Sequence, residues 1–232
     1  MTLMAIGDVH GRNTWKRLVN TQEFDKLVLL GDYFDSLDIN AQEQMNNFRD
    51  IIAFKQTNPD KVVLLIGNHD FHYLPIAMTI NETYSGFQSR YAFAISQLIE
   101  EHKHLLQMCY QWENYLFTHA GVTHTWLHNA GYNAEAVDVF INELFQHQPR
   151  RFFFNGNDPY GDNVTQSPIW VRPASLKKNA YKYETVKQVV GHTTVKKLEI
   201  VKERFYFIDT MGTSKEYFIV EDGSVVIDKV YT

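Results

Sequence analysis

The sequence predicts an α/β fold in which helices pack against a largely parallel sheet. Three apolar runs near the N-terminus, at residues 3–6, 26–30 and 62–66, are each followed directly by a glycine, as buried strands that lead into loops often are. Two stretches with apolar residues at helical spacing separate these runs. The order strand, helix, strand, helix, strand implies right-handed crossovers and parallel strands.

The chain is expected to form one domain over residues 1–232. This length lies within the range of a single α/β unit. Hydrophobic residues make up 44% of the chain, which is enough for a large two-layer core and argues against disorder. No linker, repeat or low-complexity segment divides the sequence.

The two early helices have recognisable ends. Asn13 or Thr14 can cap the first, which carries apolar residues on one side. The second begins at Ala41, repeats apolar residues at helical spacing and closes before Pro59.

The middle of the chain alternates between regular and irregular segments. Residues 88–103 and 134–147 each place apolar side chains on one helical stripe, which predicts two further helices. Residues 105–110 and 115–118 predict a hairpin. Residues 71–87 show no sustained period, so they form either a wall or lid over a site or a packed connector.

The C-terminal part begins with a long irregular stretch at residues 149–175. Such a stretch inside a compact domain is more often functional than accidental, so we expect it to line a site. Five strand-like runs follow, which we expect to be antiparallel: 188–190, 198–201, 204–208, 216–220 and 225–230. The last two flank Asp222-Gly223, a strong hairpin signal.

Composition excludes several classes of protein. The net charge is -5, and no basic tract indicates a nucleic-acid partner. The single cysteine, Cys109, allows no intrachain disulfide. The N-terminus has no secretory signal, and no apolar run approaches the length of a membrane span. We therefore expect a soluble cytoplasmic protein.

Five strand-like runs end in glycine-flanked Asp, Asn or His residues. The stretches are Gly7-Asp8-Val9-His10-Gly11, Gly31-Asp32-Tyr33-Phe34-Asp35, Ile66-Gly67-Asn68-His69-Asp70, Thr118-His119-Ala120-Gly121 and Gly191-His192-Thr193. Open α/β sheets place their chemistry at such strand ends. Carboxylates and imidazoles suit manganese, iron or zinc, and the two oxygens of Asp32 can bridge two cations. The set therefore predicts a two-metal hydrolytic site.

These stretches resemble, in order, the motifs of the calcineurin-like metallophosphoesterases: GDxH, GDxxD, GN(H)D/E, H and GH. The glycine at Gly11, the threonine at Thr194 and the stretch 209–212 are similar to the branch of Ser/Thr protein phosphatases and related bacterial and phage enzymes. The resemblance implies two sandwiched sheets flanked by helices, with the metal site at the carboxyl ends of the strands.

The resemblance also implies roles for individual residues. It implies two ligand sets that share one carboxylate: Asp8, His10 and Asp32 for one metal ion, and Asp32, Asn68, His119 and His192 for the other. The ions would be divalent transition metals, manganese in the first place, with iron or zinc as alternatives. His69 would be the general acid, oriented and charged by Asp35, because a carboxylate neighbour raises the pKa of an imidazole and fixes its tautomer.

The sequence departs from this branch at Ser36, where the protein phosphatases usually have a phosphate-clamping arginine. Two arginines are candidates to replace it. We prefer Arg172, which lies in a Trp-Val-Arg segment similar to that of the bacterial and phage enzymes, over Arg12. His72 is expected to pack or to line the rim of the site, because the ligand sets are complete without it.

Three functional hypotheses follow. The first is hydrolysis of phosphate monoesters, with a phosphoprotein, a nucleotide or a small phosphorylated molecule as substrate. The second is hydrolysis of dinucleoside polyphosphates of the Ap4A type, since similar bacterial enzymes share these motifs. The third is a scaffold that has kept the fold and lost catalysis, although such proteins typically lose ligands that this chain retains.

Overall fold

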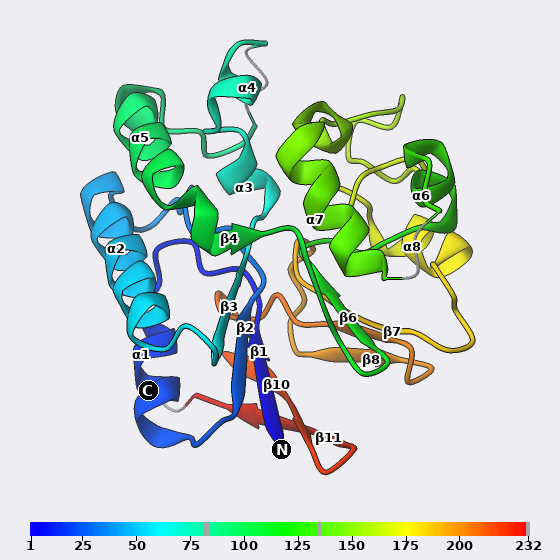
Figure 1. The fold of residues 1–232 in the computed structure, drawn as a ribbon. Helices are drawn as coiled ribbons and strands as arrows, with labels where there is room; N and C mark the ends of the chain where they lie inside the picture. Colours follow the sequence, from blue (N-terminus) through cyan, green and yellow to red (C-terminus); the bar gives the residue numbers. More distant parts are fainter. Residues whose placement is uncertain (81–83, 134–135, 231–232) are drawn as a thin grey trace.

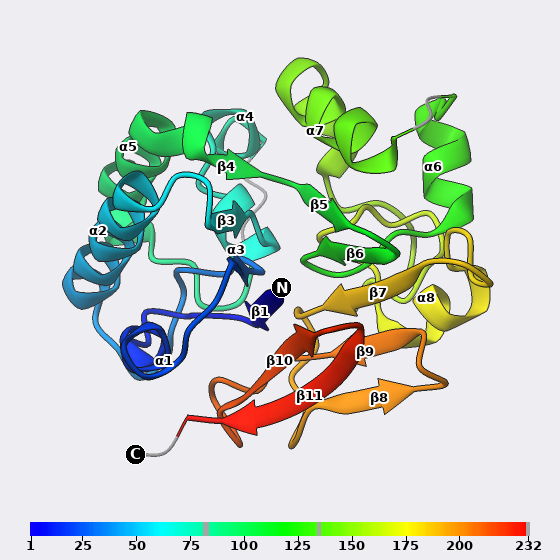
Figure 2. The ribbon, with the colours of Figure 1, turned by 60° about the horizontal axis from the view of Figure 1, so that its bottom comes forward.

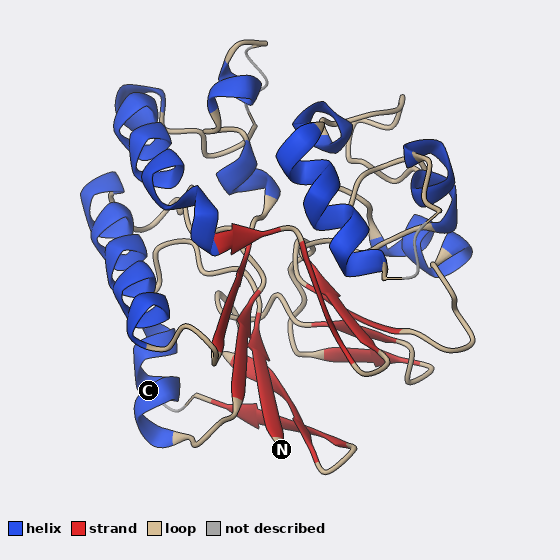
Figure 3. Ribbon diagram, in the orientation of Figure 1, coloured by secondary structure: helices blue, strands red, loops and turns tan. Residues whose placement is uncertain are grey.

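The computed structural model describes residues 1–80, 84–133 and 136–230. Two β-sheets pack against each other in the centre, and helices cover the outer side of each sheet (Figures 1 and 3). The mixed α/β class and the two sheets flanked by helices are therefore as predicted.

The first sheet has the strand order β11-β10-β1-β2-β3-β4. Its strands are β1 Thr2–Ile6, β2 Lys26–Leu29, β3 Val62–Leu65, β4 Leu106–Gln107, β10 Glu216–Glu221 and β11 Ser224–Lys229. Strands β1 to β4 are parallel, as the alternation of strands and helices predicts for the first three. Strand β10 pairs antiparallel with β1 and forms the predicted hairpin with β11 around Asp222-Gly223.

The second sheet has the order β5-β6-β7-β9-β8. Its strands are β5 Cys109–Trp112, β6 Tyr115–Thr118, β7 Lys187–Val190, β8 Glu199–Val201 and β9 Phe205–Phe207. The prediction of an entirely antiparallel C-terminal part is wrong, because β9 pairs parallel with β7. In the hairpin of β8 and β9 it is the second strand that lies beside β7, and β8 forms the edge. Local alternation predicts strands but not which strand takes the inner place.

The predicted hairpin strand at residues 105–110 is divided between the two sheets. Leu106–Gln107 pairs with β3 in the first sheet, whereas Cys109–Trp112 pairs with β6 in the second. Met108 joins the two strands and is fully buried. The chain thus crosses from one sheet to the other within a single apolar run, which has no separate signal in the sequence.

The α-helices are α1 Thr14–Thr21, α2 Ala41–Thr57, α3 Asn68–Phe71, α4 Pro75–Met78, α5 Ala92–His102, α6 His124–Ala130, α7 Val137–His147 and α8 Pro173–Asn179. The side chain of Asn40 caps α2 by accepting a hydrogen bond from the Glu43 amide at 3.0 Å. Helix α5 begins later than predicted, after a 3₁₀ turn, and the predicted start of α7 at residues 134–135 lies outside the described residues. Asn13 precedes α1 but makes no capping hydrogen bond with its side chain.

Strands β1, β2 and β3 of the first sheet are buried on both faces. Leu3 and Val28 belong to the apolar layer between the sheets, which they share with Phe117 and Tyr206. The alternate residues point to the layer formed with the helices, because side chains along a strand point alternately to either face. Figure 2 shows α1, α2 and α5 beside this sheet and α6, α7 and α8 beside the other. None of the described helices is both long and apolar enough to span a membrane.

The carboxyl ends of β1, β2 and β3 meet those of β6 and β7. Hydrogen bonds join the sheets there. The imidazole of His119, after β6, donates from Nδ1 to the Leu30 carbonyl after β2 at 2.8 Å. The His192 amide, after β7, donates to the Asp8 carboxylate after β1 at 3.1 Å. The five strand ends that carry the motifs therefore surround one place.

Candidate metal centre

Four polar residues of these strand ends have left-handed backbone conformations. The φ angles are 42° at His10, 52° at Asp32, 64° at Asp35 and 62° at His192. Non-glycine residues rarely adopt such angles, and where they do the strain is concentrated at functional sites. The loops are thus held in conformations that direct their side chains inward.

Two motif glycines allow carboxylates to lie against the backbone. A Cβ atom at Gly67 would lie 2.0 Å from Oδ1 of Asp32, and one at Gly191 would lie 2.1 Å from Oδ1 of Asp8. Both distances are shorter than any van der Waals contact. These glycines are required because any side chain would displace the carboxylates.

The side chains of Asp8, Asp32, Asn68, His119 and His192 are buried together. Ligand atoms of the two aspartates and His119 all lie within 4.8 Å of one another. Oδ1 of Asn68 lies 2.9 Å from Nε2 of His119 and 2.9 Å from Nδ1 of His192. Nε2 of His119 is also 3.3 Å from Oδ2 of Asp32.

Hydrogen bonds to backbone carbonyls assign the tautomers of three histidines. Nδ1 of His10 contacts the Phe34 carbonyl at 2.6 Å, and Nδ1 of His119 contacts that of Leu30 at 2.8 Å. Nε2 of His192 contacts the Trp170 carbonyl at 3.1 Å. A carbonyl only accepts, so each of these nitrogens carries the proton. In the neutral form of each ring the other nitrogen keeps a lone pair, as in a metal-ligating histidine.

The donor set therefore fits a metal ion. Around Asn68, the amide oxygen and, in the neutral rings, the lone pairs of His119 and His192 converge. Burial raises the pKa of Asp8, and the neighbouring carboxylates of Asp209 and Asp32 raise it further. Burial likewise raises the pKa of Asp209. A cation at this place would remove both the repulsion among the carboxylates and the clustering of lone pairs.

Comparison with known proteins identifies this arrangement. The family model described as calcineurin-like phosphoesterase matches residues 1–196. The chain belongs to this family. This phosphoesterase is accordingly a hydrolase acting on phosphoric esters, and its family depends on a dinuclear metal centre. No sequence relative was found among curated proteins.

Solved structures share the fold of this phosphoesterase at low sequence identity. A protein serine/threonine phosphatase of Saccharomyces cerevisiae with similarity to human phosphatase PP5 has a TM-score of 0.59 at 13% identity, over 98% of this chain and 79% of the other. A metallophosphoesterase of Sphaerobacter thermophilus has a TM-score of 0.53 at 17% identity, over 100% and 89% of the two chains.

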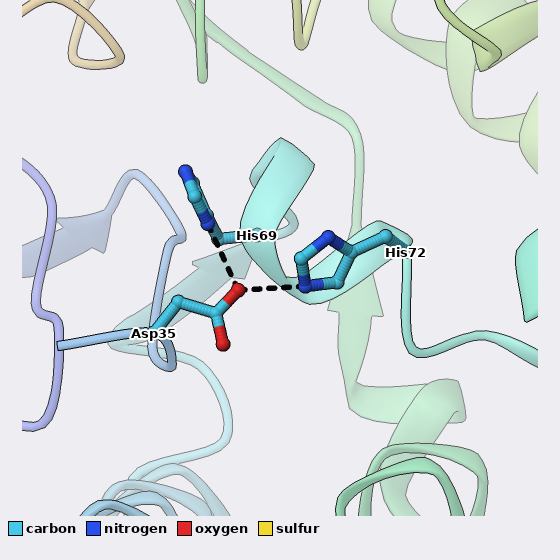
Figure 4. A group of neighbouring side chains, drawn as sticks. All are labelled: Asp35, His69 and His72. Atoms are coloured by element: carbon cyan, nitrogen blue, oxygen red, sulfur yellow. Dashed lines mark hydrogen bonds and ion pairs between the residues drawn. The ribbon is translucent and has the colours of Figure 1, made fainter. Parts of the chain in front are cut away.

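Beside the candidate metal ligands, Asp35 binds two histidines and a tyrosine. Oδ2 of Asp35 lies 2.9 Å from Nδ1 of His69 and 2.7 Å from Nε2 of His72 (Figure 4). The Tyr73 hydroxyl donates to Oδ1 at 2.5 Å. Although burial opposes it, the carboxylates of Asp32 and Asp35 raise the pKa of His69 to about 9. The surrounding carboxylates thus favour the protonated form of His69, which follows Asn68 in the chain.

His72 and Tyr73 contribute to this site in a way that the sequence does not reveal. His72 packs inside the site and does not line its rim, because only 1% of it is exposed, and it contacts the same Asp35 oxygen as His69 (Figure 4). Its ring packs against those of Tyr84 and Phe87. The available signal is its spacing of three residues from His69, which places both on one side of a helical turn.

Two further carboxylates support the strand-end loops. Asp70 accepts hydrogen bonds from the amides of Asp32 and Tyr33, both at 2.7 Å, and from that of Gly67 at 2.9 Å. Asp209 accepts a 2.6 Å hydrogen bond from Oγ1 of Thr194 and is buried near Asp8. The family resemblance includes the stretch 209–212 but implies no role for Asp209 in the site.

The two candidate anion-binding arginines differ in how they are held. Arg172 donates from Nε to the Tyr160 carbonyl at 2.8 Å, and from Nη1 to the His192 carbonyl at 3.2 Å and to Oγ1 of Thr193 at 3.1 Å. Among the described residues, neither its Nη2 nor the side chain of Arg12 makes a hydrogen bond. At Ser36 the hydroxyl accepts hydrogen bonds from backbone amides of its own turn.

The irregular segments contact the site through a few residues. Ser85 and Gly86, from the segment 71–87, line the cavity that contains His69. In the segment 149–175, the carbonyl groups of Tyr160 and Trp170 hold Arg172 and His192, respectively.

Replacing Gly67 by alanine is expected to lower the free energy of unfolding by about 1–3 kcal/mol, the usual cost of overpacking. The added Cβ would lie 2.0 Å from Oδ1 and 2.7 Å from the amide nitrogen of Asp32, so that residue must move. Thermal or denaturant unfolding measures the change. The control is Gly131→Asn, where nothing lies within 4 Å of the added Cβ and asparagine tolerates the φ of 83°. Equal losses in both variants would contradict the packing role of Gly67.

Proposed function

We propose that this protein is a metal-dependent phosphomonoesterase of the Ser/Thr protein phosphatase-like kind, acting on a phosphoprotein or a small phosphate ester. The observation that carries the proposal is the convergence of the Asn68 oxygen and two imidazole lone pairs beside a protonated His69. A cation site and a general acid at adjacent residues are what hydrolysis of a phosphate ester requires.

The proposed ligand sets are those implied by the motifs. We assign Asp8, His10 and Asp32 to one divalent ion, and Asp32, Asn68, His119 and His192 to the other, with manganese as the preferred metal. When bound, the two ions supply charge neutralisation at the phosphoryl oxygens and activation of water. The backbone carbonyls that hold the three histidines keep their rings oriented for ligation.

In this proposal His69 gives its proton to the oxygen of the leaving group. Asp35 accepts from Nδ1 of His69, so Nε2 carries the proton that is transferred. His72 and Tyr73 hold the Asp35 carboxylate from its other sides. They therefore act as positioning residues, which keep Asp35 aligned with His69.

Arg172 is proposed to bind the transferred phosphoryl group. Three hydrogen bonds fix its guanidinium group and leave Nη2 for a ligand. Burial lowers the pKa of Arg172, while the charges of Asp8 and Asp32 act in the opposite direction, which places this side chain within the field of the metal centre. A fixed guanidinium next to the centre can take over the task of the arginine that Ser36 replaces.

Arg172→Ala is expected to raise the KM for a phosphate ester about tenfold or more, because a charge-assisted hydrogen bond to the phosphoryl group is lost. Arg172→Lys should recover only part of the loss, because an ammonium group lacks the fork geometry. Steady-state kinetics and inhibition by inorganic phosphate measure the effect. Lys178→Ala, at an exposed position of α8, is the matched control. An unchanged KM in Arg172→Ala would remove this residue from the site.

The experiment that tests the proposal is a substrate panel with manganese-supplemented protein. A phosphoserine peptide, p-nitrophenyl phosphate and Ap4A are assayed side by side for release of phosphate or nucleotide. We expect hydrolysis of the two monoesters and its loss on chelation. Turnover of Ap4A with little monoesterase activity would refute the proposal, as would the absence of any hydrolysis with manganese, iron or zinc.

A further inference from the structure

The side of the site where His69 lies opens into a cavity of about 250 Å³. His10 and His69 line one part of it, and Arg12 and Asp38 line another. Since the leaving oxygen takes its proton from His69 in the proposed reaction, the leaving group of the substrate must occupy this cavity.

A second cavity, of about 670 Å³, adjoins the first. Both are lined by Arg12 and Asp38, so they meet at these side chains. Its walls are the start of α1, one side of α2, and the loop that includes Gly212 and Lys215. A leaving group longer than the first cavity would extend past Arg12 into the second.

The cations of the second cavity differ in whether they are already paired. Lys16 forms an ion pair with Asp50 at 2.5 Å. In the part of the chain that the structure describes, the side chains of Arg12 and Lys215 form neither an ion pair nor a hydrogen bond. The carboxylates of Asp38 and Glu43 also line the cavity, so it suits a single anionic group next to Arg12 better than a long polyanion.

Arg12 is held in place by packing. A Cβ atom at Gly212 would lie 3.1 Å from Nη2 and 3.4 Å from Cζ of Arg12, so the guanidinium group lies close to the glycine backbone. Since no described residue uses its donors, the five N–H groups of the guanidinium remain for a ligand. A half-buried guanidinium positioned in this way is a specific receptor for phosphate or carboxylate.

We propose that Arg12 binds a second anionic group, a phosphate or a carboxylate, on the leaving group of the substrate. The inference rests on the proposed phosphomonoesterase function and narrows its substrate class to phosphomonoesters that carry a further anion. Arg172 and Arg12 then have separate tasks, since the first binds the phosphoryl group that is transferred and the second selects the leaving group.

The test compares matched esters by release of inorganic phosphate. The esters without a second anionic group are ethyl, butyl and hexyl phosphate. In one matched series the leaving group carries a second phosphate: ethane-, butane- and hexanediol bisphosphate. In the other matched series it carries a terminal carboxylate, as in the corresponding phosphohydroxy acids. We expect kcat/KM of the wild type to be about 10- to 100-fold higher for at least one partner than for its alkyl phosphate, the range of a charge-assisted hydrogen bond. The two series distinguish phosphate from carboxylate.

Arg12→Ala should abolish this preference, whereas Arg172→Ala should lower kcat/KM for both members of each pair and keep their ratio. Gly212→Ala should reduce the preference by displacing Arg12. Arg17→Ala, at an exposed position of α1, is the control for charge alone. Calorimetric binding of butane bisphosphonate and butyl phosphonate gives a second readout, and the Arg12→Ala variant should bind both equally.

The outcomes separate this inference from the proposed function. If the wild type hydrolyses both members of each pair equally well, the inference is wrong. It is also wrong if Arg12→Ala lowers kcat/KM equally for both members of a pair, which would assign Arg12 to the transferred phosphoryl group. If no ester is hydrolysed under any metal, the proposed function itself fails. Circular dichroism and the unfolding midpoint of each variant show that a loss does not reflect misfolding.

Discussion

Replacing Asp32 by asparagine is expected to reduce phosphatase activity by at least about a thousandfold and to lower the metal content of the protein. Asp32 is the carboxylate that we assign to both ions, and its Oδ2 lies 3.3 Å from Nε2 of His119 and 3.8 Å from Nε2 of His10. An amide nitrogen at this oxygen cannot ligate, and several kcal/mol of transition-state stabilisation depend on the ions. Metal analysis after manganese loading and kcat/KM for p-nitrophenyl phosphate measure both effects.

Asparagine is chosen because it can keep the second contact of this side chain. Oδ1 of Asp32 accepts a 2.9 Å hydrogen bond from the His69 amide, which the amide oxygen of asparagine can still accept. Asp60→Asn, at an exposed position, is the control for the loss of one charge. An Asp32→Asn protein with full metal content and the activity of the wild type would overturn the assignment of a shared ligand.

Replacing His69 by asparagine is expected to lower kcat by about 10²- to 10⁴-fold for an alkyl phosphate, the usual contribution of a general acid. The loss should be much smaller for p-nitrophenyl phosphate, because its phenolate leaves with little help from a proton. The metal content should stay unchanged, since His69 is not among the assigned ligands. Equal losses for both substrates would assign His69 to binding or to metal ligation instead.

The pH dependence of the hydrolysis rate is a second test of His69 as the general acid. The neighbouring carboxylates raise the pKa of His69 to about 9, so in the absence of metal it is protonated below this pH and loses its proton above it. Bound cations act in the opposite direction and lower this value. The rate for the alkyl phosphate should therefore fall on the alkaline side, and Asp35→Asn should move the fall to lower pH. A pH profile that is identical in wild type and Asp35→Asn would contradict this coupling.

The parallel half of the fold could be predicted because its strands are short apolar runs that end at glycine. Each run is buried on both faces, so its composition alone marks it as a strand. The inner place of β9 and the crossing between the sheets at Met108 could not be predicted in this way. Both depend on which strands pair, and pairing is decided by contacts between distant segments.

The site, like the fold, has some residues that the sequence predicts and others that it does not. Polar residues directly after buried strands are conspicuous in the sequence, and their convergence follows from the shared edge of parallel strands. His72 and Tyr73 carry no such mark, because they lie in a helical turn among aromatic and apolar residues. Asp209 does follow a buried strand, β9, but no glycine precedes it as one precedes Asp8, Asp32 and Asn68. What they contact is set by the packing of segments about 30 to 200 residues apart, as the contacts of His72 with Asp35 and of Asp209 with Asp8 illustrate.

The assigned ligands come from both layers of the sandwich: Asp8, His10, Asp32 and Asn68 follow strands of the first sheet, and His119 and His192 follow strands of the second. An ion held by both groups would act as a cross-link between two halves that otherwise meet through an apolar layer and hydrogen bonds at the strand ends. The free energy of metal binding then contributes to the cohesion of the two sheets. Removal of the ions would therefore weaken the fold as well as stop the chemistry.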